Sequence, residues 1–272
     1  MGPEQKRTLS KIRHVALDMD GTIYLGDTLF PYTVPFLERL DRLGITYSFL
    51  TNNPSSSRKA YLDKLRGMGV PADLSRIYTT IELTISYLRT ELPGVRRLYI
   101  LGTPSMTEEF IAAGYEPVDD NPEAVVVAFD RTLVYERLCR AAWWIKAGLP
   151  YIATNPDFVC PTNQPTVLVD CGSICACLEK ATGRRPDVTL GKPDPNFVLS
   201  IARDHSISAP EVAVVGDRLY TDIASGVNAG ALSVLVLSGE TDLEMARRSE
   251  IRPDVIVNDI DEFGHMLEDS LK

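Results

Sequence analysis

The feature that most constrains the fold of this chain is a regular alternation of short apolar runs with longer amphipathic segments. Apolar runs of four to six residues are typical of buried strands, and apolar residues at a spacing of three to four are typical of helices. Strands are expected at residues 14–17, 45–50, 97–101, 125–129, 151–153, 212–215, 233–237 and 254–257. Helices are expected at 33–43, 55–68, 104–113, 132–147, 173–182 and 195–204. This alternation favours the α/β class, with parallel sheets covered by helices on both faces.

With 272 residues, the chain is long enough for two compact units. Segments with candidate chemistry lie before residue 55 and after residue 190, and the middle third has its own strand–helix pattern without them. Residues 183–186 (GRRP) are polar and contain proline, as a crossing between domains often does. We therefore predict a core domain formed by residues 1–82 and 187–272, with a second α/β domain, residues 83–186, inserted at a loop.

Charge, hydropathy and cysteine content exclude several classes of protein. The chain has 28 basic and 37 acidic residues, a net charge of −9, and no long basic run, so we expect it to bind neither nucleic acid nor an anionic membrane. Its apolar runs are far shorter than the roughly 20 residues of a membrane helix. No apolar stretch follows the basic start, and five cysteines leave at least one unpaired. We expect a cytoplasmic protein with reduced thiols.

Two carboxylates follow the first expected strand. Asp18 and Asp20 lie two residues apart in an extended segment, so their side chains point to the same side. Gly21 permits a sharp turn after them. Paired carboxylates at a strand end can hold a hard divalent cation, or divide nucleophilic attack and proton transfer between them. The alternative is a solvated turn, since Asp and Gly are common in turns.

Three further segments are each expected to follow a strand. Thr51, Asn52 and Asn53 could cradle a phosphate ahead of a helix, or Asn53 or Ser55 could simply cap that helix. Lys192, fixed by neighbouring prolines, could neutralise a phosphate or a carboxylate, or be ordinary surface lysine. Asp217 could supply another metal ligand, and Asp222 could orient a metal-bound water or hold Lys192.

Together, the four segments DMDGT, LTNN, GKPDP and GDRLYTD resemble, in order, the signature motifs of the haloacid dehalogenase (HAD) superfamily of phosphatases. Residues 152–157 (IATNPD) and 171–184 (CGSICACLEKATGR) resemble the subgroup with a large α/β cap, of the C2 type, which includes NagD-type and p-nitrophenylphosphatase-like enzymes. The resemblance extends from about residue 12 to residue 262. It implies a Rossmann-like parallel-sheet core domain with an inserted α/β cap domain.

The resemblance implies a role for each motif residue. Asp18 would be the nucleophile that forms an aspartyl-phosphate, and Asp20 the general acid and then the general base. Magnesium (Mg²⁺) would be held by the Asp18 carboxylate, the Asp20 backbone carbonyl and Asp217. Phosphoryl oxygens would be bound by Thr51, the adjacent Asn52 amide and Lys192, with Asn53 beside them. In the cap, the loop with Asn155 and Asp157 would contact the leaving group.

These expectations describe a hydrolase of a small phosphate ester, such as a sugar phosphate or a nucleoside monophosphate. A homodimer of the protein would be compatible with them. The stretch 159–170 (VCPTNQPTVLVD) matches no known specificity and leaves the substrate open. The alternative function is a non-catalytic or regulatory phosphometabolite-binding protein of the same fold. A dehalogenase lacks the acid at the position of Asp20, and a receiver module lacks the large insert. A P-loop kinase would need a G-x-x-x-x-G-K-[ST] motif, which this sequence lacks.

Cysteine and tryptophan residues of the insert are expected to be structural. Cys171, Cys175 and Cys177 do not have zinc-site spacing, and Cys175 and Cys177 lie about 200° apart on a helix. We expect all three to be buried small residues. Trp143 and Trp144 are expected in the core of the inserted domain.

Overall fold

A computed structural model describes residues 2–160 and 166–272. The chain divides into two compact units, each described here by itself. Unit 1 consists of Met1–Leu50, Leu62–Tyr78 and Lys192–Lys272, and unit 2 of Thr51–Tyr61 and Thr79–Gly191. Compact units are not the same as independently folding domains, so the boundaries expected at 82/83 and 186/187 stay a prediction.

Unit 1 is built on a six-stranded sheet with the order β15-β14-β13-β1-β4-β5. Its strands are β1 (His14–Asp18), β4 (Thr46–Thr51), β5 (Ile77–Thr79), β13 (Val212–Gly216), β14 (Leu232–Val236) and β15 (Val255–Val257). β1 is parallel to both β4 and β13, and β14 is parallel to β13 and β15. All side chains of β13 and β14 are buried, because helices cover both faces of a sheet of this kind.

The helices of unit 1 precede, connect or follow its strands along the chain, and the first residues of α3 are assigned to unit 2. They are α1 (Pro3–Leu9), α2 (Thr33–Leu43), α3 (Arg58–Gly67), α8 (Pro195–Asp204), α9 (Ala224–Ala229), α10 (Leu243–Arg248) and α11 (Ile260–Ser270), with a small β2–β3 hairpin (Tyr24–Leu25, Thr28–Leu29). α11 packs on α1 and α2, while α8 packs on α9 and β13. α2 has the bounds expected from the sequence and ends at Gly44, whose positive φ of 69° suits glycine.

Unit 2 contains a second parallel sheet with the order β12-β9-β8-β6-β7. Its strands are β6 (Arg97–Leu101), β7 (Glu116–Pro117), β8 (Ala124–Val127), β9 (Tyr151–Ala153) and β12 (Val188–Thr189), beside a β10–β11 hairpin (Val159–Cys160, Leu168–Val169). Its helices are α4 (Thr80–Glu91), α5 (Pro104–Ala112), α6 (Tyr135–Lys146) and α7 (Cys171–Thr182).

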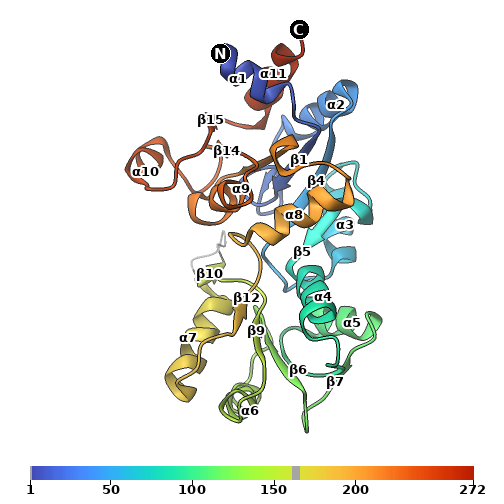
Figure 1. Cartoon of the computed structure of the whole chain (residues 1–272), viewed down its shortest axis with the longest axis vertical. Helices are drawn as coiled ribbons and strands as arrows, with labels where there is room; N and C mark the ends of the chain where they lie inside the picture. The colour runs from blue at the N-terminus through green and yellow to red at the C-terminus, as the bar shows by residue number, and fades with distance from the viewer. Residues whose placement is uncertain (1, 161–165) are drawn as a thin grey trace. The chain divides into compact units, whose positions relative to one another are not determined.

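Alternate residues of β6, β8 and β9 pack on opposite layers of helices. Leu98 and Ile100 of β6 lie in one apolar cluster with residues of α4 and α5. Tyr99 and Leu101 lie in a second cluster with residues of α6 and α7. This period of two places α4 and α5 on one face and α6 and α7 on the other (Figure 1). The α/β class with parallel sheets, predicted from the sequence, is confirmed.

Several local predictions were wrong. α3 begins at Arg58 rather than at residue 55, because the Ser57 hydroxyl accepts a hydrogen bond from the Ala60 N–H and caps the helix. Cys171 and Cys175 are buried as expected, but Cys177 lies on the outer side of α7 and is exposed. Trp143 is 70% exposed rather than part of the core.

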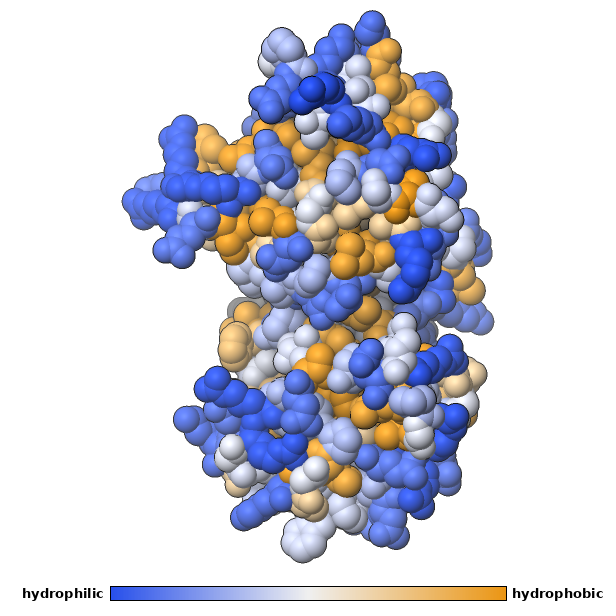
Figure 2. All heavy atoms as spheres, in the orientation of Figure 1, coloured by the Kyte–Doolittle hydropathy of each residue, from blue (hydrophilic) through white to orange (hydrophobic). Residues whose placement is uncertain are grey.

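Surface character agrees with the charge of the chain. Figure 2 shows hydrophilic residues over much of the visible face, with smaller apolar areas between them. In residues 2–160 and 166–272, no helix combines the length and the apolar character that a membrane span requires. Of the stretch 159–170, residues 161–165 lie outside the described part of the chain.

Candidate functional site

The carboxyl ends of β1 and β13 meet at one edge of the unit 1 sheet. Leu17 pairs with Val215; Asp18 is the last residue of β1, and Asp217 directly follows the last residue of β13. On the other side of β1, Asp18 pairs with Leu50, the residue before Thr51. Parallel pairing therefore brings together motifs that are far apart in the sequence, at the edge where ligands bind to open α/β sheets.

A compact group of charges occupies this edge. One carboxylate oxygen from each of Asp18, Asp217 and Asp222 lies within 4.8 Å of the other two. Lys192 is 3% exposed, and its Nζ forms ion pairs with Asp18 Oδ1 and, at 2.6 Å, with Asp222 Oδ1. Of the two roles expected for Asp222, the structure shows the contact with Lys192.

Burial and mutual repulsion govern protonation in this group. Burial, followed by the neighbouring Asp222 charge, raises the pKa of Asp18 to about 8 and that of Asp217 to about 6. Burial disfavours the charged form of Lys192, but the carboxylates of Asp18 and Asp222 outweigh it and raise the pKa of Lys192. Lys192 pairs with Asp18 and Asp222, and the charge of Arg218 also acts on the three carboxylates.

Glycines make room for the carboxylates. A Cβ at Gly21, where φ is +84°, would lie 2.4 Å from Asp217 Oδ2, and a Cβ at Gly239 would lie 2.0 Å from the same atom. Asp222 lies in a π-helical turn, Leu219–Ile223, of a kind that often occurs at functional sites. The turn directs the Asp222 side chain against Gly216, where a Cβ would come within 2.3 Å.

The residues at this edge fit a divalent cation. Asp217 Oδ2 accepts a hydrogen bond from the Glu240 N–H at 2.6 Å, while the buried Asp217 Oδ1 has no hydrogen-bond partner among the described residues. A buried carboxylate oxygen without a donor is costly in a protein of any fold. Asp18 and Asp217 therefore offer the oxygen ligands that a hard cation such as Mg²⁺ prefers.

Asp20 lies outside this buried group. Its side chain is exposed, and a backbone bridge joins its residue to Tyr24. Partial desolvation raises the pKa of the Asp20 carboxyl, although Lys64 and the Gly26 backbone act in the opposite direction. A carboxyl group with a raised pKa and access to solvent suits proton transfer.

Thr51, Asn52 and Asn53 belong to unit 2. The Asn53 N–H donates to Thr51 Oγ1 at 3.1 Å, and the Ser55 N–H donates to Asn53 Oδ1 at 2.9 Å, so Asn53 orders the turn rather than capping α3. The Asn52 side chain donates to Asp157 Oδ2 at 2.9 Å. The preceding glycine of the third motif, Gly191, lies so close that a Cβ there would be 2.8 Å from Asn52 Oδ1.

The third motif differs from its expected setting. It does follow a strand, β12, but this strand pairs with β9 in the unit 2 sheet and not with the unit 1 sheet. Lys192 is the first residue of the returning segment of unit 1. The sequence could not reveal this, because a two-residue strand has no periodicity.

Both expected residues of the loop after β9 have partners inside unit 2. Asn155 is fully buried, and its side chain donates to Asp157 Oδ2 and to Asp170 Oδ1, each at 3.0 Å. Asp170 also accepts from the Cys171 N–H and caps α7. Sequence reasoning missed Asp170, although an aspartate before a helix is a typical capping signal. The expected contact of Asn155 and Asp157 with a leaving group stays a prediction.

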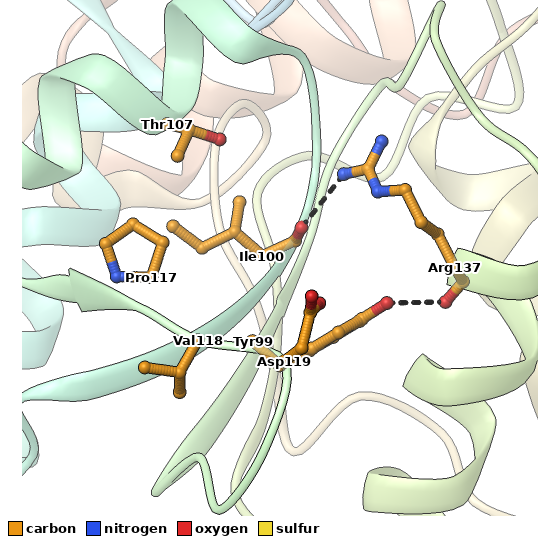
Figure 3. Close-up of a pocket in the computed structure, with 7 residues that line it drawn as sticks. All are labelled: Tyr99, Ile100, Thr107, Pro117, Val118, Asp119 and Arg137. Carbon is orange, nitrogen blue, oxygen red and sulfur yellow. Dashed lines mark hydrogen bonds between the residues drawn. The ribbon is translucent and has the colours of Figure 1, made fainter.

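Unit 2 contains a hollow of about 250 Å³ (Figure 3). Its lining consists of Tyr99, Ile100, Thr107, Pro117, Val118, Asp119 and Arg137 and contains none of the predicted site residues. The Arg137 guanidinium is held by the Ile100 and Gly102 carbonyls and by Asp130, so its charge is already balanced.

Known proteins resemble this chain over nearly its whole length. Residues 15–116 match the family described as haloacid dehalogenase-like hydrolase, and residues 189–263 match one described as HAD-hydrolase-like. Ribonucleotide monophosphatase NagD of Escherichia coli K12 is 31% identical, over 93% of this chain and 98% of NagD.

Solved structures agree with this relationship. A 4-nitrophenylphosphatase from Thermotoga maritima has a TM-score of 0.91 at 41% identity, and the match covers 95% of this chain and 98% of that one. A glycerol phosphate phosphatase from Mycobacterium tuberculosis, in complex with magnesium, has a TM-score of 0.85 at 30% identity, over 96% of this chain and 77% of that one. The chain belongs to the haloacid dehalogenase-like hydrolases and, among them, to the group of NagD-like phosphatases.

Proposed function

We propose that this protein is a magnesium-dependent phosphomonoester hydrolase that acts through an aspartyl-phosphate on Asp18. The observation that carries the proposal is the buried group of Asp18, Asp217, Asp222 and Lys192 at the carboxyl edge of β1 and β13. This group combines a carboxylate nucleophile, a fixed cation and acidic metal ligands. Phosphoryl transfer needs mainly positioning and charge neutralisation, which these groups provide.

Asp18 attacks the phosphorus atom, and a bond forms between its carboxylate oxygen and phosphorus as the bond to the ester oxygen breaks. Asp20 donates its proton to the departing alcohol and then, as a carboxylate, takes a proton from the water that attacks the aspartyl-phosphate. That second attack breaks the bond between Asp18 and phosphorus and releases inorganic phosphate. General acid–base help of this kind contributes about 10²–10⁴-fold.

Lys192 neutralises the phosphoryl group, while Asp222 keeps the ammonium in place and charged. Thr51, Asn52 and Asn53 complete the binding of phosphoryl oxygens with hydroxyl and amide groups. Because the chain carries a net charge of −9, these local donors have to overcome an unfavourable overall field for an anionic substrate.

Mg²⁺ would be held by the Asp18 carboxylate, the Asp20 backbone carbonyl and Asp217. When bound, it supplies positive charge that stabilises the transferring phosphoryl group. The magnesium complex of the M. tuberculosis relative supports the choice of ion.

The substrate we propose is a small phosphorylated metabolite, such as a sugar phosphate or a nucleoside monophosphate. Relatives named for ribonucleotides and for glycerol phosphate support this class. We further propose that residues 83–186 act as a cap on a core of residues 1–82 and 187–272, and that the enzyme works in the cytoplasm.

We also propose that the enzyme forms a homodimer. Tyr135 is 81% exposed, and it shares one stripe of α6 with Cys139 and Trp143, which follow at intervals of four residues. Large exposed aromatic side chains grouped in this way often mark an interface. Sedimentation of the wild type and of Trp143→Ser tests this: a wild-type monomer at micromolar concentration would contradict it.

Phosphate release from p-nitrophenyl phosphate, measured with Mg²⁺ and with EDTA, tests the proposed activity. We expect release that requires the metal, and a panel of ribonucleoside monophosphates, sugar phosphates and glycerol phosphate then ranks the substrates. If folded, magnesium-loaded protein binds these esters but hydrolyses none of them, the chain is a phosphometabolite-binding protein and the enzymatic proposal fails.

A further inference from the structure

The loop after β9 is joined by side-chain hydrogen bonds within unit 2 to residues 51–53, the segment that we propose binds phosphate. Two amide groups donate to the same oxygen, Asp157 Oδ2: the Asn52 side chain at 2.9 Å and the Asn155 side chain at 3.0 Å. Asp157 is 9% exposed and Asn155 is fully buried. A hydrogen bond from a neutral donor to a buried carboxylate is among the stronger hydrogen bonds in proteins.

These contacts fix the orientation of the Asn52 amide. A carboxylate only accepts hydrogen bonds, so the amide atom that faces Asp157 is the NH₂ group, and Asn52 Oδ1 points elsewhere. That oxygen lies over Gly191, at a distance that leaves no room for a Cβ. The backbone of Asn52 is also held, since its carbonyl accepts from Thr80 Oγ1 at 3.4 Å.

The loop that carries Asp157 is held by its own backbone. The Gly172 N–H donates to the Asp157 carbonyl at 2.8 Å, and a Cβ at Gly172 would come within 2.3 Å of the Pro156 carbonyl. The Phe158 carbonyl accepts from the Asp170 N–H at 3.0 Å and from Ser173 Oγ at 2.6 Å. The start of α7 therefore holds the backbone of the loop, while the Asp157 side chain accepts from the Asn52 and Asn155 amides.

We propose that Asp157 is a positioning residue: it orients Asn52 for binding of the phosphoryl group instead of contacting the leaving group. The inference rests on the proposed function. It gives Asp157 a role different from the leaving-group contact expected from the sequence. Every substrate presents the same phosphoryl group. Loss of the Asp157 carboxylate should therefore lower kcat/KM by the same factor for all substrates.

The experiment compares Asp157→Ala with the wild type on three esters with different leaving groups: p-nitrophenyl phosphate, a ribonucleoside 5′-monophosphate and glycerol phosphate. We expect kcat/KM to fall about ten-fold or more, equally for all three, as loss of one charge-assisted hydrogen bond predicts. Inorganic phosphate, measured by calorimetry, should bind more weakly by a similar factor.

Variants with defined changes separate positioning from general loss of structure. Asp157→Asn keeps an oxygen that accepts from both amides, so it should recover most of the loss. The double variant, Asn52→Ala with Asp157→Ala, should bind phosphate as tightly as Asn52→Ala alone, because the two residues act as one. Asp187→Ala removes a carboxylate of the same unit that is bonded to Arg184 and the Tyr151 N–H, and it should leave phosphate affinity unchanged.

Effects of Asp157→Ala that differ ten-fold or more among the three esters would show a contact with the leaving group and overturn the inference. Additive effects of Asn52→Ala and Asp157→Ala would also overturn it. If the wild type hydrolyses none of the esters, the proposed function fails, while phosphate binding by Asp157→Ala still decides the inference. If the wild type does not bind phosphate either, both are overturned.

Discussion

The two units have parallel sheets of similar build, but the polar residues at their strand ends are balanced differently. In unit 2, Asp130 follows β8, and its carboxylate accepts from Thr132 and forms an ion pair with Arg137 at 2.7 Å. Thr103 follows β6 and accepts from the Met106 N–H, which caps α5. In unit 1, Asp18, Asp217 and Asp222 lie close together, and Lys192 forms ion pairs with Asp18 and Asp222.

The parallel topology that the two sheets share does not determine whether the charges at their strand ends are paired. Both sheets bring strand ends together at one edge, as parallel pairing requires. In unit 2, Asp130 is paired with Arg137, whereas unit 1 retains a buried carboxylate oxygen, Asp217 Oδ1, without a donor among the described residues. A carboxylate oxygen that the protein leaves without a donor is available to a cation.

The largest effect is expected at the nucleophile. Asp18→Asn should lower turnover by at least about 10⁴-fold and leave the fold intact, because an amide cannot form the aspartyl-phosphate. Steady-state kinetics and circular dichroism measure the two properties. Wild-type turnover in this variant, with hydrolysis of the amide back to Asp excluded by mass spectrometry, would contradict the assignment.

Asp20→Asn should lower kcat by about 10²–10⁴-fold for esters of poorly acidic alcohols and by less for p-nitrophenyl phosphate, whose leaving group needs little protonation. A plot of log kcat against the pKa of the leaving alcohol measures this dependence. An equal loss for all leaving groups would show that Asp20 is not the general acid.

Asp217→Ala should raise the concentration of Mg²⁺ required for half-maximal activity by about ten-fold to 100-fold, since one oxygen ligand is lost. The control is Asp130→Ala in unit 2, which should leave the magnesium requirement unchanged because Asp130 is already paired with Arg137. An unchanged requirement in Asp217→Ala would remove Asp217 from the metal site.

Stability should respond with opposite signs in the two units. Asp130→Ala should lower the free energy of unfolding by about 3 kcal/mol, because it leaves the Arg137 charge without its buried partner. In EDTA at pH 7, Asp217→Asn should raise it by about 1 kcal/mol, since the amide cannot carry the buried charge. Urea unfolding measures both changes.

The pH dependence of Asp217 follows from the same cause. Because burial raises its pKa to about 6, the folded protein retains a proton there that the unfolded chain has lost. The metal-free wild type should therefore lose stability as pH rises from about 4 to about 6, and Asp217→Asn should lose less over that range. If metal-free Asp217→Asn were less stable than the wild type at pH 7, the predicted difference in sign between the two units would be wrong.

Local patterns in the sequence predicted much of the fold. The apolar spacing and the closing glycine defined α2, and the alternating strands and helices defined the parallel class. Helix starts were less certain, since only the structure shows that Ser57 and Asp170 are the capping residues of α3 and α7. Cys177 and Trp143 are exposed because they lie on the sides of α7 and α6 that the sheet does not cover. The spacing of apolar residues in the sequence did not identify those sides.

For the site, the sequence placed Asp18 and Asp217 at neighbouring strand ends and gave the contact of Asp222 with Lys192 as one of two roles. The sequence did not decide between those two roles, because the π-helical turn that carries Asp222 has no pattern of its own. Asn52 follows β4 and Asp157 lies in the loop after β9, so the hydrogen bond between them depends on tertiary contacts alone.

The most direct test of Asp18 as the nucleophile is the detection of phosphate on this residue. The magnesium-loaded enzyme is mixed with p-nitrophenyl phosphate, quenched in acid within milliseconds, digested and analysed by mass spectrometry. We expect the peptide that contains Asp18 to gain one phosphoryl group, and the matching peptide of Asp18→Asn to gain none. Rapid release of p-nitrophenol by an enzyme that never carries phosphate on Asp18, or that carries it on another residue, would contradict the claim.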